Sequence, residues 1–256
     1  MRREFPHLLY ETRGRVATIM LNRPQVLNAC NYAVKHDLLA ALELAAADTQ
    51  LRVLAIRGAG RAFCAGIDLK ELSSGGIDER NFELWERCLR RIETMDLVSI
   101  CLLHGYALGS GIQIGLACDL RVATPGTKIG LPAGREGLIP GLSVWRLARF
   151  IGMGRAKSLA IWGDSIDGEE AMRIGLVSAL VSEENRDAEF DALLERTVAA
   201  ASWGVRATRL TMNLSADLGW EGAFATYMEH QKQGLASADF REAMSAYREK
   251  REPVWT

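Results

Sequence analysis

Short apolar runs alternate with longer amphipathic stretches over the first two thirds of the chain. The short runs, bounded by glycine or polar residues, predict strands at 8–12, 16–21, 52–57, 98–103, 120–123, 128–130 and 176–181. Apolar residues at helical spacing predict helices at about 31–47, 79–95, 109–119, 143–151, 154–162 and 168–173, and only helices from about residue 187 onward. This order is typical of an α/β or α+β fold with one core.

Individual residues mark where some of these elements begin or end. Arg13-Gly14 predicts the turn of a hairpin, Asn31 is a candidate N-cap, and Ser143 is a candidate cap for the helix after it. The run Ser73–Gly76 predicts a flexible break, which is either a loop over a pocket or a plain surface loop.

Two of the predicted strands run into glycine-rich turns that open helices. The strand at 98–103 is followed by Gly105, Gly109 and Gly111, and the strand at 52–57 by a turn ending at Gly66. Glycine lets a ligand approach the backbone closely, and a helix N-terminus offers unpaired N–H donors to negative charge. The two turns therefore predict a site for an oxyanion, and the alternative is close packing at the start of two ordinary helices.

Composition excludes several classes of function. The chain has 256 residues and a formal charge of −1, with no basic block, which argues against a nucleic-acid partner. The segment 1–6 lacks the apolar core of a signal peptide, and no apolar run reaches the ~20 residues of a membrane span. Five cysteines without paired spacing and four scattered histidines predict reduced thiols, a cytoplasmic protein and no metal site.

Several segments, in order along nearly the whole chain, resemble the enoyl-CoA hydratase/isomerase (crotonase) superfamily. They are Leu21-Asn22-Arg23-Pro24, the turn from Gly58 to Leu69, the turn from Gly105 to Asp119, Gly130-Leu131-Pro132 with Gly137-Leu138-Ile139-Pro140-Gly141, Ala171 to Val177, and the tail from Arg248 to Trp255. The resemblance implies a crotonase-like spiral of ββα units at 1–190 and a C-terminal helical region at 191–256. That region would serve trimerisation and pocket closure, giving a homotrimer or hexamer. The implied substrate is an acyl-CoA thioester, with no cofactor beyond its coenzyme A moiety.

The resemblance also assigns binding roles to individual residues. The backbone N–H groups of Ile67 and Ser110 would form the oxyanion hole, where Ser110 replaces the family's glycine. The Ala65 carbonyl would accept from the adenine amine, Val26 and Leu27 would line the adenine and pantetheine, and Lys70 would lie near coenzyme A. Tyr247 and Lys250 would reach coenzyme A from a neighbouring subunit. Surface lysines in solvent are the alternative for Lys70 and Lys250.

The acid–base residues depart from the family pattern. Gln113 and Ala133 stand where family hydratases have glutamates, and Gly141 stands where some members have Asp or Tyr. Glu136 is the candidate replacement, in a Leu-Pro-Ala-x-x-Glu-Gly pattern that looks like the dihydroxyphenylacetyl-CoA dioxygenase branch. The alternative is a structural ion pair of Glu136 with Arg135 or another cation. Gln113 would position a water or a substrate carbonyl, or would simply be a satisfied polar group.

Three further polar residues are interpreted as structural. His104 is expected to be packed, Asp68 to cap a helix and Cys64 to be inert.

Two hypotheses remain for the function. The first hypothesis is an acyl-CoA enzyme that works through an enolate-like intermediate with a non-standard acid–base set. The second is a non-catalytic acyl-CoA-binding or scaffold subunit.

Overall fold

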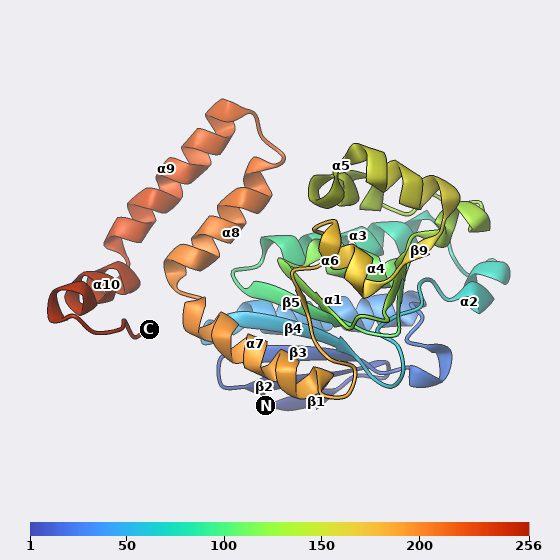
Figure 1. The fold of residues 1–256 in the computed structure, drawn as a ribbon, viewed down its shortest axis with the longest axis horizontal. Helices are drawn as coiled ribbons and strands as arrows, with labels where there is room; N and C mark the ends of the chain where they lie inside the picture. The colour runs from blue at the N-terminus through green and yellow to red at the C-terminus, as the bar shows by residue number, and fades with distance from the viewer. Residues whose placement is uncertain (256) are drawn as a thin grey trace.

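Within residues 1–255, which the computed structural model describes, the strands form two sheets (Figure 1). The larger sheet has the order β1-β2-β3-β4-β5-β7-β10, made of β1 (Arg2–Glu4), β2 (Leu8–Arg13), β3 (Val16–Leu21), β4 (Val53–Gly58), β5 (Val98–Leu103), β7 (Leu120–Ala123) and β10 (Ala179–Leu180). The smaller sheet has the order β6-β8-β9, made of β6 (Tyr106–Leu108), β8 (Lys128–Gly130) and β9 (Ser165–Ile166). Pairing is antiparallel from β1 to β3 and parallel from β3 to β10.

Helices lie in the crossovers between the parallel strands and make up the C-terminal third of the chain. They are α1 (Tyr32–Ala47), α2 (Leu69–Ser73), α3 (Glu79–Thr94), α4 (Ser110–Ala117), α5 (Ser143–Trp162), α6 (Gly168–Arg173), α7 (Arg186–Ala200), α8 (Trp203–Ser215), α9 (Trp220–Ala236) and α10 (Ala238–Glu249). Two short 3₁₀ helices, η1 (Pro24–Val26) and η2 (Pro132–Glu136), are also present. The predicted mixture of strands and helices is therefore confirmed.

The central strands of the larger sheet are buried on both faces, and their side chains alternate between two apolar clusters. In β4, Leu54 and Ile56 pack in the cluster that includes α1 and α3, while Val53 and Ala55 pack with Phe190 of α7. This period of two is what a central strand requires when both faces are covered. The result is a rigid sheet from whose strands the glycine-rich turns emerge.

Several predicted ends are confirmed. Gly14 has a φ of +55° in the turn between β2 and β3, and the Asn31 side chain accepts from the Val34 N–H at 2.9 Å. The two helices predicted at 143–151 and 154–162 form one element, α5, which is interrupted by non-helical geometry at Gly152 (φ 75°, ψ 157°). Glycine tolerates this left-handed conformation, so the predicted break is a kink.

Two predictions about element ends are wrong. Ser143 does not cap α5: the helix begins at Ser143 itself, Leu142 is the N-cap, and the buried Ser143 hydroxyl has no partner in the described structure. The strand predicted at 176–181 shortens to Ala179–Leu180, because the N–H groups of Leu176 and Val177 donate to the Ala171 carbonyl and close the end of α6.

The C-terminal helices project from the body of the molecule (Figure 1). The boundary predicted at residue 190 falls inside α7, which remains packed on the sheet through Phe190 and Leu194. Arg209 then fastens α8 to the core, donating to the carbonyl of Leu97 at 2.9 Å and pairing with Asp119 at 2.9 Å. Helix α9 has no buried residue, so the projecting arm consists of α9 and α10 carried on α8.

Candidate functional site

The two glycine-rich turns lie directly against each other. The Cys64 N–H donates to the Tyr106 carbonyl at 2.9 Å, and the Leu108 N–H donates to the Cys64 carbonyl at 3.0 Å. Gly66 (φ +116°) and Gly109 (φ +49°) are so close that a Cβ on Gly109 would lie 3.4 Å from the Gly66 Cα. Glycine is favoured at both positions because the φ values are positive, and a Cβ on Gly66 would also lie 3.3 Å from the Leu108 carbonyl oxygen.

Beside this contact, Ile67 and Ser110 both belong to the lining of one cavity. Ser110 is the first residue of α4, so its N–H has no acceptor within the helix. On either side of Ile67, the Gly66 carbonyl and the Asp68 N–H are bonded to Cys30, at 2.8 and 3.0 Å. In residues 1–255, neither Ile67 nor Ser110 donates its N–H to another residue, and both residues line the cavity.

The cavity has a volume of about 380 Å³ and a mostly apolar wall. One side is formed by the glycine-rich turns, and the other by α3, η2 and the segment 138–144. Five polar or charged side chains belong to residues of its lining: Lys35, Glu86, Ser110, Gln113 and Glu136. These five side chains define the chemistry available to a ligand in the cavity.

Gln113 is held at both ends of its amide. Its Oε1 accepts from the Trp85 indole N–H, and its Nε2 donates to the Pro140 carbonyl at 3.1 Å. A carboxamide exchanges no proton near neutral pH, so the contacts support a positioning role or a satisfied polar group. Gly141 beside it carries no base, and a Cβ there would lie 2.8 Å from Glu86 Oε1, so a larger residue would require the Glu86 side chain to move.

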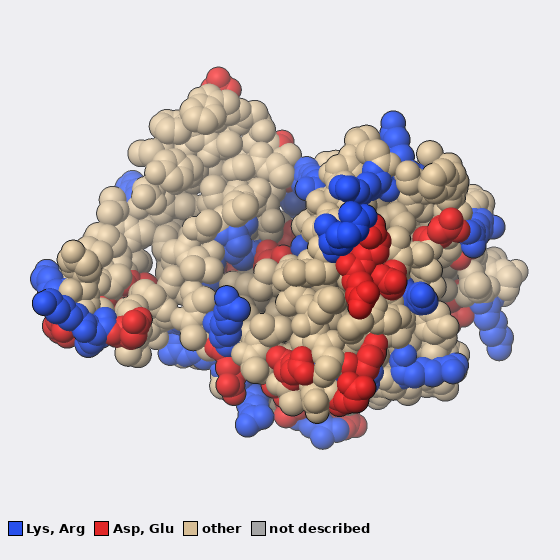
Figure 2. All heavy atoms as spheres, viewed as in Figure 1, with Lys and Arg blue, Asp and Glu red and all other residues tan. Residues whose placement is uncertain are grey.

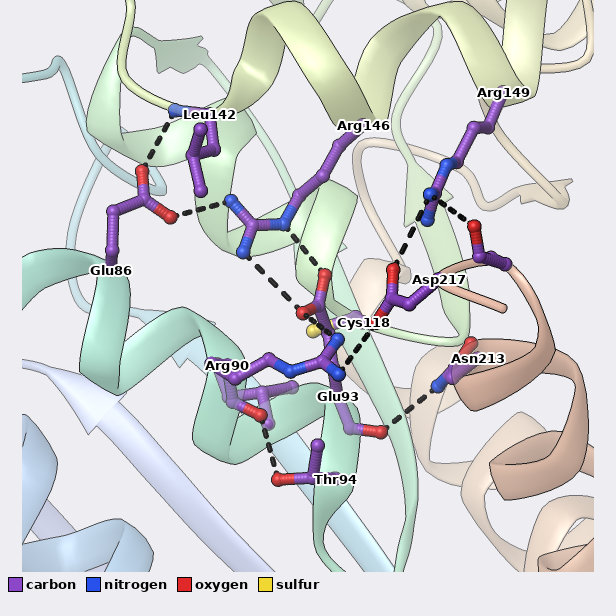
Figure 3. A network of polar contacts seen from close by, with 12 residues as sticks. Glu86, Arg90, Glu93, Thr94, Cys118, Leu142, Arg146, Arg149, Asn213 and Asp217 are labelled. Atoms are coloured by element: carbon purple, nitrogen blue, oxygen red, sulfur yellow. Dashed lines mark hydrogen bonds and ion pairs between the residues drawn. The ribbon is translucent and has the colours of Figure 1, made fainter. Parts of the chain in front are cut away.

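Glu86 is engaged in a polar network on the wall of the cavity. Its Oε2 accepts from Arg146 Nη1 at 2.8 Å, and its Oε1 accepts from the Leu142 N–H at 2.8 Å (Figure 3). Arg146 is also bound to Glu93 at 2.6 Å, which ties α5 to α3. With both oxygens bound, Glu86 serves to hold the wall in place.

Glu136 has a different environment. In a 3₁₀ helix the side chains at i and i+3 eclipse, so Glu136 in η2 projects from the same face as Ala133, about 6 Å further along the axis. The predicted alternative, a pair with Arg135, is not what the structure shows: Arg135 binds Asp164 at 2.6 Å, and no ion pair reaches Glu136 from residues 1–255. Burial raises the pKa of Glu136 above its ordinary value.

The predicted coenzyme A residues fall in two groups. Leu27 and Ala65 are joined by a hydrogen bond from the Ala65 N–H to the Leu27 carbonyl at 2.9 Å, with Val26 beside them in η1. Lys70 is exposed in α2, which follows the first turn. Tyr247, which is 82% exposed, lies on α10 at the opposite end of the molecule from α2 (Figure 1).

Lys250, the C-cap of α10, shares that remote position. The first group can therefore act together in one protomer, whereas Tyr247 and Lys250 cannot reach the cavity of their own chain.

Three residues have the structural roles expected from the sequence. His104 is 2% exposed outside the cavity lining, with Nε2 3.1 Å from the Gly60 carbonyl, and burial lowers its pKa. Asp68 caps α2 by accepting from the Lys70 N–H at 3.2 Å. Cys64 is buried, and its thiol contact with Cys30 together with burial holds its pKa well above the ordinary value.

Sequence reasoning missed Lys35 and Trp85 as residues of the cavity. Lys35 is in α1, three and four residues before Leu38 and Leu39, two positions on the apolar face predicted for that helix. The sequence signal that could have identified Lys35 as a cavity residue is a lysine on the buried face of an amphipathic helix.

Two other kinds of feature are absent from the described residues. The described chain has no group of three or more His, Cys, Asp or Glu side chains arranged to hold a metal ion. None of the helices within residues 1–255 combines the length and apolar character needed to cross a bilayer.

Comparison with known proteins places this geometry in context. The family model described as enoyl-CoA hydratase/isomerase matches residues 11–256. The chain is 30% identical to a Clostridium acetobutylicum protein named short-chain-enoyl-CoA hydratase over 97% of each chain, and 30% identical to a Syntrophomonas wolfei crotonyl-CoA hydratase over 96% of each. A crystal structure of an enoyl-CoA hydratase from Mycobacterium smegmatis superimposes with a TM-score of 0.91 at 28% identity, covering 98% of this chain and 99% of that one.

Proposed function

Since the chain belongs to the enoyl-CoA hydratase/isomerase family, we propose that it processes acyl-CoA thioesters through an enolate bound by the N–H groups of Ile67 and Ser110. Negative charge develops on the thioester oxygen when a proton leaves the adjacent carbon. Two fixed backbone donors at that oxygen stabilise the charge without reorganising. The contact between the two turns supports this assignment, because Ile67 and Ser110 both line the cavity beside it.

We further propose that Glu136 transfers the proton. The observation that carries this proposal is that, within residues 1–255, Glu136 is the carboxylate lining the cavity without a hydrogen bond or ion pair, whereas both oxygens of Glu86 are bound. The carboxylate would take a proton from the carbon next to the thioester, leaving an enolate, and would return it to the same or a conjugated carbon. Its raised pKa brings it closer to the working pH of a general base.

Coenzyme A would lie along the first turn. The Ala65 carbonyl would accept from the adenine amine, beside Val26 and Leu27, and Lys70 would face the phosphates. The hydrogen bond from the Ala65 N–H to the Leu27 carbonyl supports this grouping, because it holds the loop and the first glycine-rich turn together. Tyr247 and Lys250 would contact coenzyme A of a neighbouring subunit, and the five buried free cysteines fit a reducing compartment such as the cytoplasm.

We expect a homotrimer or a hexamer assembled through the region 191–256. The face of α8 and α9 seen in Figure 2 carries few charges, and exposed side chains there include Met212 at 70%, Trp220 at 75% and Phe224 at 50%. Such a surface is typical of a subunit interface. Light scattering at micromolar concentration should give three or six times the mass of one chain, and a monomer would contradict the assembly.

Hydration of crotonyl-CoA should be slow. The positions of the two family glutamates hold Gln113 and Ala133, and losing one acid–base group costs about 10²–10⁴-fold. Loss of enoyl-thioester absorbance measures the rate, which should rise in a variant with Ala133→Glu and Gln113→Glu.

In this double variant, the structure makes Ala133→Glu the more informative change, because a carboxylate at position 113 would face the Pro140 carbonyl. A wild-type rate typical of efficient two-glutamate hydratases would show that one carboxylate suffices.

The enzyme and scaffold hypotheses differ in one readily measured property. An enzyme that forms the enolate exchanges the hydrogens next to the thioester of a saturated acyl-CoA with solvent, even when no product forms. Mass spectrometry after incubation of a panel of acyl-CoA thioesters in D₂O should show a gain in mass. Binding without exchange across the whole panel would support the non-catalytic subunit instead.

A further inference from the structure

Lys35 is a buried cation on the wall of the cavity. Its side chain belongs to α1, it is 1% exposed, and it lines the same space as the two glycine-rich turns. Lys35 has no role in the proton transfer proposed for Glu136.

The contacts of Lys35 leave its charge without a carboxylate. Nζ donates to Asn81 Oδ1 and lies 5.8 and 5.4 Å from the ring centres of Phe82 and Trp85. No ion pair to Lys35 occurs within the described part of the chain. Glu71 is an acidic group near enough to act on it electrostatically, but its carboxylate accepts from the Tyr32 N–H at 2.9 Å.

A second buried polar group at this place also lacks a partner. Asn81 is fully buried, its Oδ1 faces Lys35, and its Nδ2 makes no hydrogen bond in residues 1–255. A buried amide N–H without an acceptor costs free energy, and so does a buried ammonium with one hydrogen bond and two aromatic rings. Both groups are donors, and Lys35 is the one that lines the cavity, where an anion could bind it.

The position of Lys35 relative to the proposed reaction centre follows from three contacts. Ser110 and Gln113 are one turn apart on α4, and Gln113 accepts from the Trp85 indole. The Lys35 ammonium lies over the Trp85 ring. Along these contacts Gln113 and Trp85 lie between the ammonium and Ser110, and we take this part of the wall as the acyl end of the cavity.

We propose that Lys35 binds a carboxylate at the far end of the acyl group, so that the preferred substrates are coenzyme A thioesters of short dicarboxylic acids. This assignment rests on the proposed function, because it takes the thioester oxygen to lie between Ile67 and Ser110. The apolar side chains of the lining would surround the methylene groups between the two ends. Asn81, which lies outside the cavity lining, would hold the ammonium in place through its Oδ1.

The test compares two thioesters of equal chain length that differ at the far end. Calorimetric titration should show glutaryl-CoA binding about tenfold or more tightly than pentanoyl-CoA, as expected for a charge-assisted hydrogen bond in a buried site. Lys35→Met keeps the length and apolar stem of the side chain and removes the charge. In this variant the preference should disappear or reverse.

Asn81→Asp provides a second, nearly isosteric variant that keeps the lysine. The new carboxylate pairs with Lys35 inside the protein, so glutaryl-CoA should lose its advantage while pentanoyl-CoA binds as before. Both variants should melt at or above the wild-type temperature, since Lys35→Met removes the unpaired buried charge and Asn81→Asp gives it a partner. If Lys35→Met does not fold, Asn81→Asp still decides the question.

The readouts separate this inference from the proposed function. Equal affinity of the wild type for the two thioesters, or an unchanged preference in either variant, overturns the role of Lys35. Solvent exchange of the hydrogens next to the thioester is measured on the same samples. Its absence with both compounds would overturn the enolate chemistry and leave the binding preference as a separate result.

Discussion

Ser110→Pro is expected to lower kcat by about 10²–10³-fold, the loss typical of removing one oxyanion donor. Proline has no N–H, so the change removes one of the two donors proposed for the thioester oxygen. The position suits the substitution, because Ser110 is the first residue of α4, where proline is common and its N–H makes no helical bond. Solvent exchange and turnover of acyl-CoA measure the effect.

Two comparisons keep this result interpretable. Ser110→Ala removes the hydroxyl and keeps the backbone N–H, so it should retain nearly all the activity. Thermal melting of the proline variant should stay close to the wild type. Loss of activity in the alanine variant equal to that in the proline variant would assign the effect to the side chain and remove the N–H from the mechanism.

Glu136→Gln should lower the rate of exchange about 10²–10⁴-fold, the usual contribution of a general acid or base. The substitution preserves size and removes only the ability to carry a proton. Because burial raises the pKa of Glu136, the folded protein disfavours its charged form, and the neutral amide should leave the melting temperature unchanged or higher. Glu184→Gln, at an exposed glutamate, is the matched control.

The pH dependence gives a second readout for Glu136. The carboxylate form is the base, so kcat/KM should rise with pH through a pKa above the ordinary glutamate value of about 4.3. This acidic limb should vanish from the residual activity of Glu136→Gln. If that variant keeps full activity, or keeps the limb, Glu136 is not the base.

The sequence predicted the elements whose local signals are strong. Val53 to Ile56 form a continuous apolar run because β4 is buried on both faces, and Asn31 marks its helix through its own side chain. Strands β1, β6 and β9 were missed, since runs of two or three residues carry no periodicity and depend on a partner strand. The Ser143 prediction failed because one residue separates a cap from a first helical residue.

The sequence predicted the parts of the candidate site that backbone groups form. It missed the parts that depend on contacts between side chains from distant elements. Glycines at 66 and 109 indicated two turns with close backbone approach, and these turns are in contact. The partners of Gln113 and Glu86 come from other elements, so no local pattern could show that both are fully bonded. Likewise, Glu136 has no ion pair with Arg135 because Arg135 pairs with Asp164, which is distant in the sequence.

The most direct test of the proposed chemistry is a crystal structure with a bound acyl-CoA that cannot turn over. The thioester oxygen should lie about 2.7–3.1 Å from the backbone nitrogens of both Ile67 and Ser110, with the Glu136 carboxylate facing the adjacent carbon. A thioester oxygen beyond hydrogen-bond reach of both nitrogens, with Glu136 turned away from the acyl chain, would contradict the account.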